Sequence, residues 1–154
     1  MEKWVNKILA SLCIFIMSFL VICVIWQVLA RWIGISSTFT DELARFLFMW
    51  TGLIGAAYTL GQKRHLALDL LLQKLHGKNK KHLQFIILTL SLIFVLLVMM
   101  LGGITLVSDT LASQQISPVL GVPMGFIYLS IPVSGGFMIF YLICQYIEFF
   151  RGEA

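Results

Sequence analysis

The chain has 154 residues, of which 60% are hydrophobic and only 12% are charged, with a net charge of +4. That charged share is about half the usual value for a soluble domain. The apolar residues also occur in long runs without helical or alternating breaks. A soluble protein of this length cannot bury so much apolar surface, so we expect an integral membrane protein.

Four apolar runs are candidates to cross a bilayer, which takes roughly 20 residues of helix. They lie at about residues 8–30, 43–61, 83–108 and 122–150. Within lipid, a single segment satisfies its own backbone only as a helix. We therefore expect an all-α integral membrane protein with one four-helix domain over residues 1–154. The first run is too long for a signal-peptide core, and no convincing cleavage site follows it, so we expect a retained helix.

Two acids and an arginine stand at the start of the second run, in the stretch TDELARFLFMW. Thr40 is suited to cap this helix, and Asp41 and Glu42 then fall in its first turn, where the helix dipole favours negative charge. Arg45 lies three and four residues further on, so all three charges share one face. Without Arg45 the run spans only about 24 Å, which is short for a hydrocarbon core of about 30 Å. We expect Arg45 to lie at the membrane boundary, paired with Asp41 or Glu42, or alternatively with an acid on another chain.

The segment between the second and third runs mixes leucines and charges at helical spacing. Leucines recur at i, i+3, i+4 and i+7, while His65 and Asp69 lie on the opposite face. This pattern predicts an amphipathic helix over about residues 65–76 that lies in the membrane interface, with nearby lysines beside anionic lipid headgroups. The alternative is that the second span continues through this segment as one long helix.

The fourth run contains two prolines and a group of small residues. Pro123 lies near its start, where a missing N–H costs little, whereas Pro132 should kink the helix. Ser134, Gly135 and Gly136 form a small-residue surface, which allows another helix to approach closely in lipid. The alternative is that these residues merely reflect the usual composition of membrane helices.

The distribution of basic residues predicts the orientation. Nine of the eleven lysines and arginines fall at the N-terminus, at the C-terminus or in the loop between the second and third spans, and only Arg31 and Arg45 fall on the other side. The positive-inside rule therefore places both termini in the cytoplasm. Because topology accounts for the basic residues and no aromatic–basic motif accompanies them, we expect no nucleic-acid partner.

The sequence lacks the patterns that catalysis, cofactor binding or ion transport would require. The middles of the four runs contain no ionisable residue, which an ion or solute pathway needs. The three histidines all fall between the second and third runs, so no haem site is expected. No metal-ligand or nucleophile–base pattern occurs, and the three cysteines lie inside the apolar runs, where we expect free thiols. The chain is therefore expected to be neither an enzyme nor a pore by itself, and to bind no cofactor or metal.

Two segments of the chain resemble a known family. Residues 36–57, S-x-x-x-x-D-E-L-A-R-F-L-F-M-W-T-G-L-I-G-A-A, followed by HLALDLL with His65 and Asp69, are similar to the small membrane subunit of TRAP transporters, the DctQ-like family. The segment SPVLGVPMGFIYLSIPVSG, residues 117–135, also resembles that family's stretch before and within its last helix. Chain length, four spans and cytoplasmic termini agree with the resemblance.

The resemblance implies a function that composition does not reveal. TRAP systems combine a periplasmic substrate-binding protein, a large twelve-span membrane subunit that carries out transport, and a small membrane subunit. They import organic acids, among them C4-dicarboxylates, sialic acid and other sugar acids, by sodium-coupled symport across the bacterial inner membrane. The small subunit extends the fixed scaffold of the large one. A scaffold or assembly subunit of an unrelated membrane complex is the alternative.

The same resemblance suggests roles for individual residues. Glu42 and Arg45 match the family's charged pair, which would fix the second helix to its neighbours or to the large subunit. Trp50 and Gly55 match the same helix and would pack. His65 and Asp69 match the loop motif and, as an i, i+4 pair, would hold the interfacial helix. For each, local structural support and direct partner contact both remain open.

Overall fold

The computed structural model describes residues 2–35, 37–62 and 78–151, and over these residues the chain is helical apart from its connections and one isolated β-bridge. The first two helices are α1 (Glu2–Trp32) and α2 (Thr38–Gly61). A third helical stretch combines α4 (Lys78–Phe94), the π-helix η1 (Val95–Gly102) and α5 (Gly103–Ala112). The short α6 (Met124–Tyr128) and the long α7 (Ser130–Arg151) form the last one.

All four of the helical stretches just described are long and apolar enough to cross a membrane. They are Trp4–Trp32, Thr38–Gly61, Lys81–Ala112 and Met124–Arg151. The predicted four-helix membrane fold is therefore confirmed at this level, and the chain is a multi-pass membrane protein. The expected interfacial helix over residues 65–76 lies outside the described residues.

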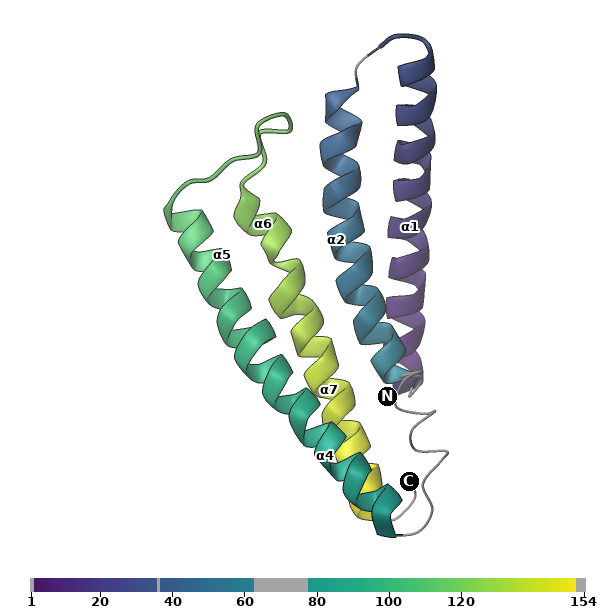
Figure 1. The fold of residues 1–154 in the computed structure, drawn as a ribbon, viewed down its shortest axis with the longest axis vertical. Coiled ribbons are helices and arrows are strands. Elements are labelled where there is room, and N and C mark those ends of the chain that lie inside the picture. The colour runs from purple at the N-terminus through teal and green to yellow at the C-terminus, as the bar shows by residue number, and fades with distance from the viewer. Residues whose placement is uncertain (1, 36, 63–77, 152–154) are drawn as a thin grey trace.

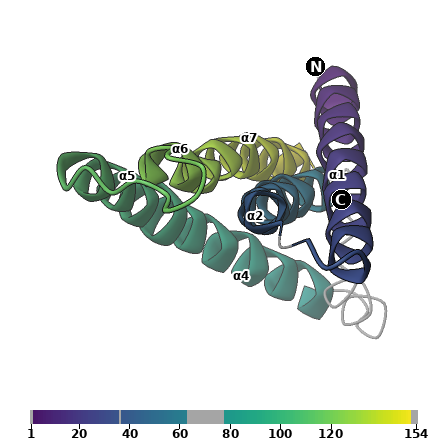
Figure 2. The same cartoon turned by 90° about the horizontal axis from the view of Figure 1, so that it is seen from above.

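The four stretches form two helical pairs that lie close together at one end and diverge toward the other (Figure 1). One pair is α1 with α2, and the other joins the third stretch to α6 and α7. Glu2 and Arg151 lie at the closed end, which we call the terminal end. The α1–α2 and α5–α6 connections lie at the opposite, loop end. Seen from above, α2 lies between α1 and the other two stretches, so it joins the two pairs (Figure 2).

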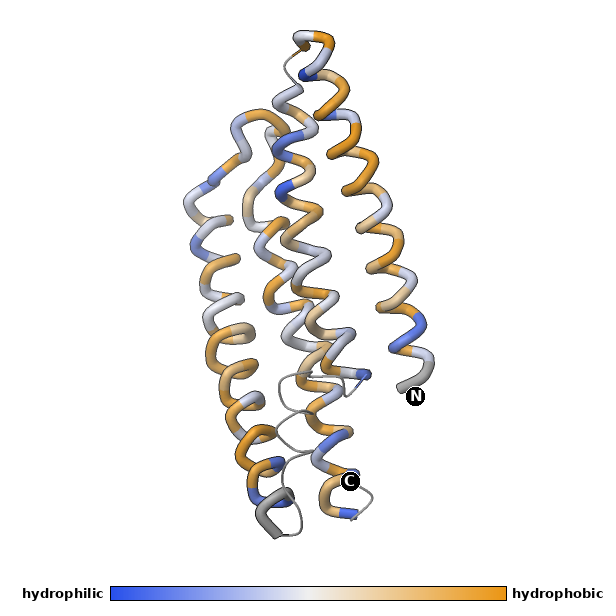
Figure 3. Tube along the Cα trace, turned by 45° about the vertical axis from the view of Figure 1, so that its right-hand side comes forward, coloured by the Kyte–Doolittle hydropathy of each residue, from blue (hydrophilic) through white to orange (hydrophobic). Residues whose placement is uncertain are grey.

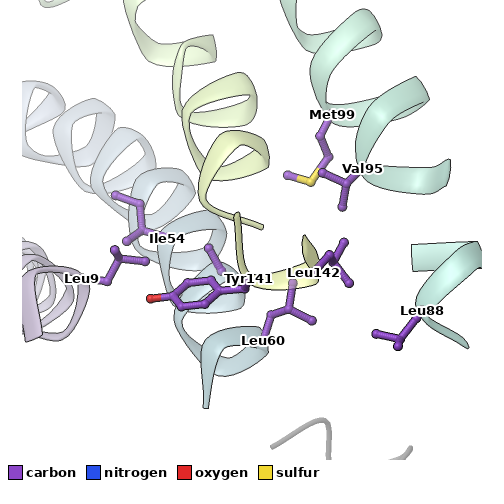
Figure 4. Close-up of a cluster of buried hydrophobic side chains, with 9 residues drawn as sticks. Leu9, Ile54, Leu60, Leu88, Val95, Met99, Tyr141 and Leu142 are labelled. Carbon is purple, nitrogen blue, oxygen red and sulfur yellow. The ribbon is translucent and has the colours of Figure 1, made fainter. Parts of the chain in front are cut away.

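The hydrophobic core gathers around α7, which contacts α2 and η1 (Figure 4). Ile54, Ala57 and Leu60 of α2 pack there with Tyr141 and Leu142 of α7. The cluster is completed by residues of α1 and the third stretch, namely Leu9, Leu88, Val95 and Met99. This core ties the two helical pairs together at the terminal end and in the middle of the bundle.

Polar contacts reinforce the terminal end. The Tyr141 hydroxyl of α7 donates a hydrogen bond to Asn6 Oδ1 of α1. Gln145 Nε2 donates to the Leu60 carbonyl of α2 at 2.9 Å. The hydroxyls of Thr89 and Tyr146 are 2.7 Å apart, which joins α4 to α7. Because α1, α2, α4 and α7 all take part, these contacts join the four helical stretches at this end.

The fourth stretch is interrupted one turn before Pro132, as its position predicts. Pro132 has no N–H to donate to the carbonyl four residues earlier, which belongs to Tyr128, the last residue of α6. Two residues after Pro132, the predicted small-residue surface is partly occupied by this chain itself. Ser134 and Gly135 are buried, and a Cβ atom at Gly135 would lie 3.1 Å from Met99 Cβ of η1, whereas Gly136 has open space.

The start of α2 differs from the prediction. The helix begins at Thr38 with Ser37 in the N-cap position, so Thr40 is not the cap. Thr40 instead lies 2.7 Å from Ser37 by their hydroxyl oxygens and donates to the Ser37 carbonyl at 3.1 Å. Because α2 begins earlier than predicted, Asp41 lies in its first turn and Glu42 lies in its second. The charged residues therefore occupy the first and second turns of the helix.

Candidate functional site at the loop end of α2

The arginine at the start of the second span pairs within its own helix. Arg45 Nη2 lies 2.7 Å from Asp41 Oδ2, and the two side chains are 75% and 56% exposed. Asp41 Oδ1 also accepts a hydrogen bond of 3.4 Å from Gln27 of α1. Asp41, Gln27 and Arg31 line an open cavity of about 490 Å³ between these helices. Asp41 thus connects the arginine to α1, and the ion pair stays accessible from outside the bundle.

Glu42 has a different role from its two charged neighbours. Its Oε2 atom accepts hydrogen bonds from the backbone N–H groups of Val119 at 3.1 Å and Leu120 at 2.8 Å. These residues belong to the connection between α5 and α6, far along the chain. The carboxylate therefore joins α2 to the second helical pair at the end where the pairs diverge. Hydrogen bonds to an ionised acceptor are stronger than those between neutral groups.

The α5–α6 connection is folded so that its backbone donors converge on Glu42. Ser117 is buried, and its N–H donates to the Val122 carbonyl at 2.9 Å. Gly121 donates in turn to the Ser117 carbonyl at 3.1 Å, and its φ of 64° is one that glycine adopts readily. Ile116 and Pro123 form the antiparallel bridge that closes this loop. The loop is thus a compact turn whose tip faces α2.

The remaining predicted residues are placed as follows. Trp50 is partly buried and packs against the hydrophobic core. Gly55 borders an apolar groove between α1 and α2, and a Cβ atom there would meet nothing within 4 Å. His65 and Asp69 lie outside the described residues. The structure thus brings Asp41, Glu42 and Arg45 to one end of α2, with Trp50 and Gly55 further along the same helix.

Sequence reasoning missed the residues on the other side of these contacts. Gln27 and Tyr141 are polar groups in apolar surroundings, which is a signal that could have singled them out, whereas Asn6 lies among the charged residues of the N-terminus and gives no such signal. The N–H groups of Val119 and Leu120 have no such signal, because nearly every residue carries a backbone donor. Among the described residues, no group of three His, Cys, Asp or Glu side chains could hold a metal ion. The contacts that the α2 cluster makes join α2 to α1 and to the α5–α6 connection.

Comparison with known proteins identifies the family. The DctQ component of the tripartite ATP-independent periplasmic transporters matches residues 20–152. The chain belongs to this DctQ family of TRAP small permease subunits.

Individual relatives agree over most of the chain. A Haemophilus influenzae protein assigned as a TRAP transporter small permease is 30% identical over 99% of this chain and 96% of its own length. The sialic acid TRAP transporter small permease SiaQ of Vibrio cholerae is 29% identical over 91% of this chain and 80% of its own length. The isethionate TRAP transporter permease DctMQ of Oleidesulfovibrio alaskensis is 24% identical over 77% of this chain, which corresponds to only 20% of that longer protein. DctQ proteins are transporter membrane subunits, and the residues that match here include the whole charged cluster of α2.

Proposed function

We propose that this chain is the scaffold subunit of a sodium-coupled TRAP transporter that imports an organic acid. In this proposal a periplasmic binding protein delivers the acid, and a large twelve-span membrane subunit moves it across the bacterial inner membrane. The terminal end of the bundle, with most of the lysines and arginines, faces the cytoplasm. The loop end, with Glu42 and the α5–α6 connection, faces the periplasm.

The observation that carries this proposal is that interhelical contacts join the helices at both ends of the bundle. Buried packing and three interhelical polar contacts join the helices at the terminal end. Glu42 joins α2 to the α5–α6 connection at the loop end. A scaffold against which another subunit moves has to keep its shape, and the relative positions of these helices are held by contacts that are far apart along the bundle.

The longer relative supports a large membrane partner. In DctMQ the segment similar to this chain is part of one polypeptide, which is about five times as long as that segment. A covalent connection of that kind is compatible with a small subunit that stays permanently beside a large permease. The relatives are named for different substrates, sialic acid and isethionate, so the transported acid of this system is a matter for direct assay.

Co-purification followed by reconstitution tests the proposal. The chain is tagged at its C-terminus, native membranes are solubilised in mild detergent, and we expect one large polytopic protein at equal stoichiometry. The purified pair is then placed in liposomes with candidate periplasmic binding proteins from the same organism. We expect uptake of an organic acid that requires both an inward sodium gradient and this chain. Recovery of the chain alone, or with a complex that does not transport, would overturn the proposal.

A further inference from the structure

One face of α2 is exposed along the whole helix. Exposed residues recur at intervals of three and four, which places them in a single row on a helix with 3.6 residues per turn. We call this row the α2 stripe, and it consists of Thr38, Asp41, Arg45, Phe48, Gly52, Ala56 and Thr59. Phe48 is the only large apolar side chain in it.

The exposed surfaces of the neighbouring spans have a different composition. They carry many large apolar side chains, such as Phe15 and Ile25 on α1 and Leu90 and Leu101 on the third stretch. In Figure 3 the trace of α1 is mostly orange, whereas α2 contains white and blue segments. Of the four candidate spans, α2 is also the least apolar. Large apolar side chains suit contact with lipid, so the α2 stripe is less suited to lipid than these surfaces of α1 and the third stretch.

The shape of the stripe suits a second helix. A Cβ atom at Gly52 or Gly55 would meet nothing within 4 Å, so the backbone of α2 is open to close approach there. Gly52 and Ala56 have the spacing at which small residues let membrane helices pack against each other. An apolar groove of about 600 Å³ runs beside them, with Met17 and Val21 of α1 on its opposite wall.

The charged residues Asp41 and Arg45, at one end of the stripe, also favour a protein neighbour over lipid. Arg45 and Asp41 are mostly exposed, although the span needs the length of helix around Arg45 to cross the hydrocarbon core. Charged groups at membrane depth normally face protein or water and not lipid. A neighbouring helix with a carboxylate or a free carbonyl at the same depth would complete the environment of the guanidinium.

We propose that the α2 stripe is the surface on which a transmembrane helix of the large membrane subunit docks. The inference rests on the proposed function, since it needs that subunit as the partner. The fused DctMQ relative supports this occupant, because there the corresponding domain shares a polypeptide with a much longer permease. The small residues set the distance between the helices, and the Asp41–Arg45 pair sets which part of the partner helix lies opposite.

Photocrosslinking in native membranes tests which face touches the partner. Phe48 on the stripe is 72% exposed and is replaced by p-benzoylphenylalanine. The matched control is the same replacement at Phe94, which is 56% exposed on the third stretch and lies equally far from the terminal end of its span. We expect an adduct between the small and the large subunit from position 48 and none from position 94. The inference is overturned if position 48 gives no protein adduct, or if only position 94 gives one. It is also overturned if position 48 crosslinks two copies of this 17.4 kDa chain to each other.

A steric variant gives an independent measurement. Gly52 is exposed and a Cβ atom there meets nothing within 4 Å, so the side chain of Gly52→Trp points away from the bundle and would collide with a docked helix, whereas Ile104→Trp adds the same side chain at an exposed position of α5. We expect Gly52→Trp to lower the co-purified large subunit by about tenfold, which corresponds to about 1.4 kcal/mol, and Ile104→Trp to leave it unchanged. Equal co-purification of both variants would refute the docking face alone. Absence of the large subunit from the wild-type preparation would instead refute the proposed function.

Discussion

Gly61 at the terminal end of α2 has no room for a methyl group. A Cβ atom there would lie 2.5 Å from Cζ and 2.6 Å from Cε1 of Tyr141, and 2.8 Å from Asn6 Oδ1. Favourable contacts between carbon atoms are about 3.5–4.0 Å long. The Tyr141 ring is only 1% exposed, and its hydroxyl is bonded to Asn6. We therefore expect Gly61→Ala to push this ring out of its position between α1 and α2.

The size of the effect follows from three contributions. Overpacking a well-filled core typically costs about 1–3 kcal/mol. Loss of the Tyr141–Asn6 hydrogen bond adds about 0.6 kcal/mol, the mean for interhelical bonds measured in a membrane protein. Alanine is favoured over glycine inside a helix by about 0.5–1 kcal/mol, an advantage that shrinks at the helix end. We expect Gly61→Ala to lower the free energy of unfolding by about 2 kcal/mol.

Gly136→Ala is the matched control. Gly136 lies in α7, is exposed, and has nothing within 4 Å of an added Cβ atom. Helix propensity alone then predicts a gain of about 0.5–1 kcal/mol. Both variants of the isolated subunit are unfolded with sodium dodecyl sulfate in mixed micelles, and unfolding is followed by the fluorescence of the four tryptophans. If Gly61→Ala resists the detergent as well as Gly136→Ala does, the packing described for the terminal end is wrong.

Three further predictions concern the polar contacts. Glu42→Ala should speed hydrogen exchange several-fold at the Val119 amide, because its acceptor is lost, while Asp41→Ala should not; equal exchange in both variants would disprove the Glu42 contact. Arg45→Ala should change the stability of the isolated chain by less than about 1 kcal/mol, as is usual for exposed ion pairs, yet reduce co-purification of the large subunit; a large loss of stability in detergent would contradict this. Tyr141→Phe should cost about 0.6 kcal/mol in the same unfolding assay, and an unchanged midpoint would argue against its bond to Asn6.

The number and type of elements could be predicted because lipid restricts the choice so strongly. A run of roughly 20 apolar residues has no other stable form in a bilayer than a helix, and the part of the chain that the structure describes contains four such helices. The position of the break in the last span also followed from local chemistry, since Pro132 removes one specific donor. The first residue of α2 was harder to predict from the sequence, because Ser37 and Thr40 are both good capping residues.

The partners of the charged residues could not be chosen from the sequence. Asp41 and Glu42 lie four and three residues before Arg45, and both spacings allow an ion pair on a helix. The structure assigns the pair to Asp41, which also accepts a bond from Gln27 of α1. Glu42 instead accepts two backbone N–H groups of the α5–α6 connection. That choice depends on how the two helical pairs are placed relative to each other.

The sequence by itself determined that this is a membrane protein with four apolar runs long enough to cross a bilayer, and its motifs pointed to the family. Both properties depend on local composition and spacing, which act within one segment at a time. Only the tertiary structure decided that Glu42 joins the loop end of α2 to the α5–α6 connection, that Gly61 lies against Tyr141, and that Gly52 and Ala56 face outward. Each of these depends on which helix faces are buried against one another, and many pairings of four apolar helices satisfy lipid equally well.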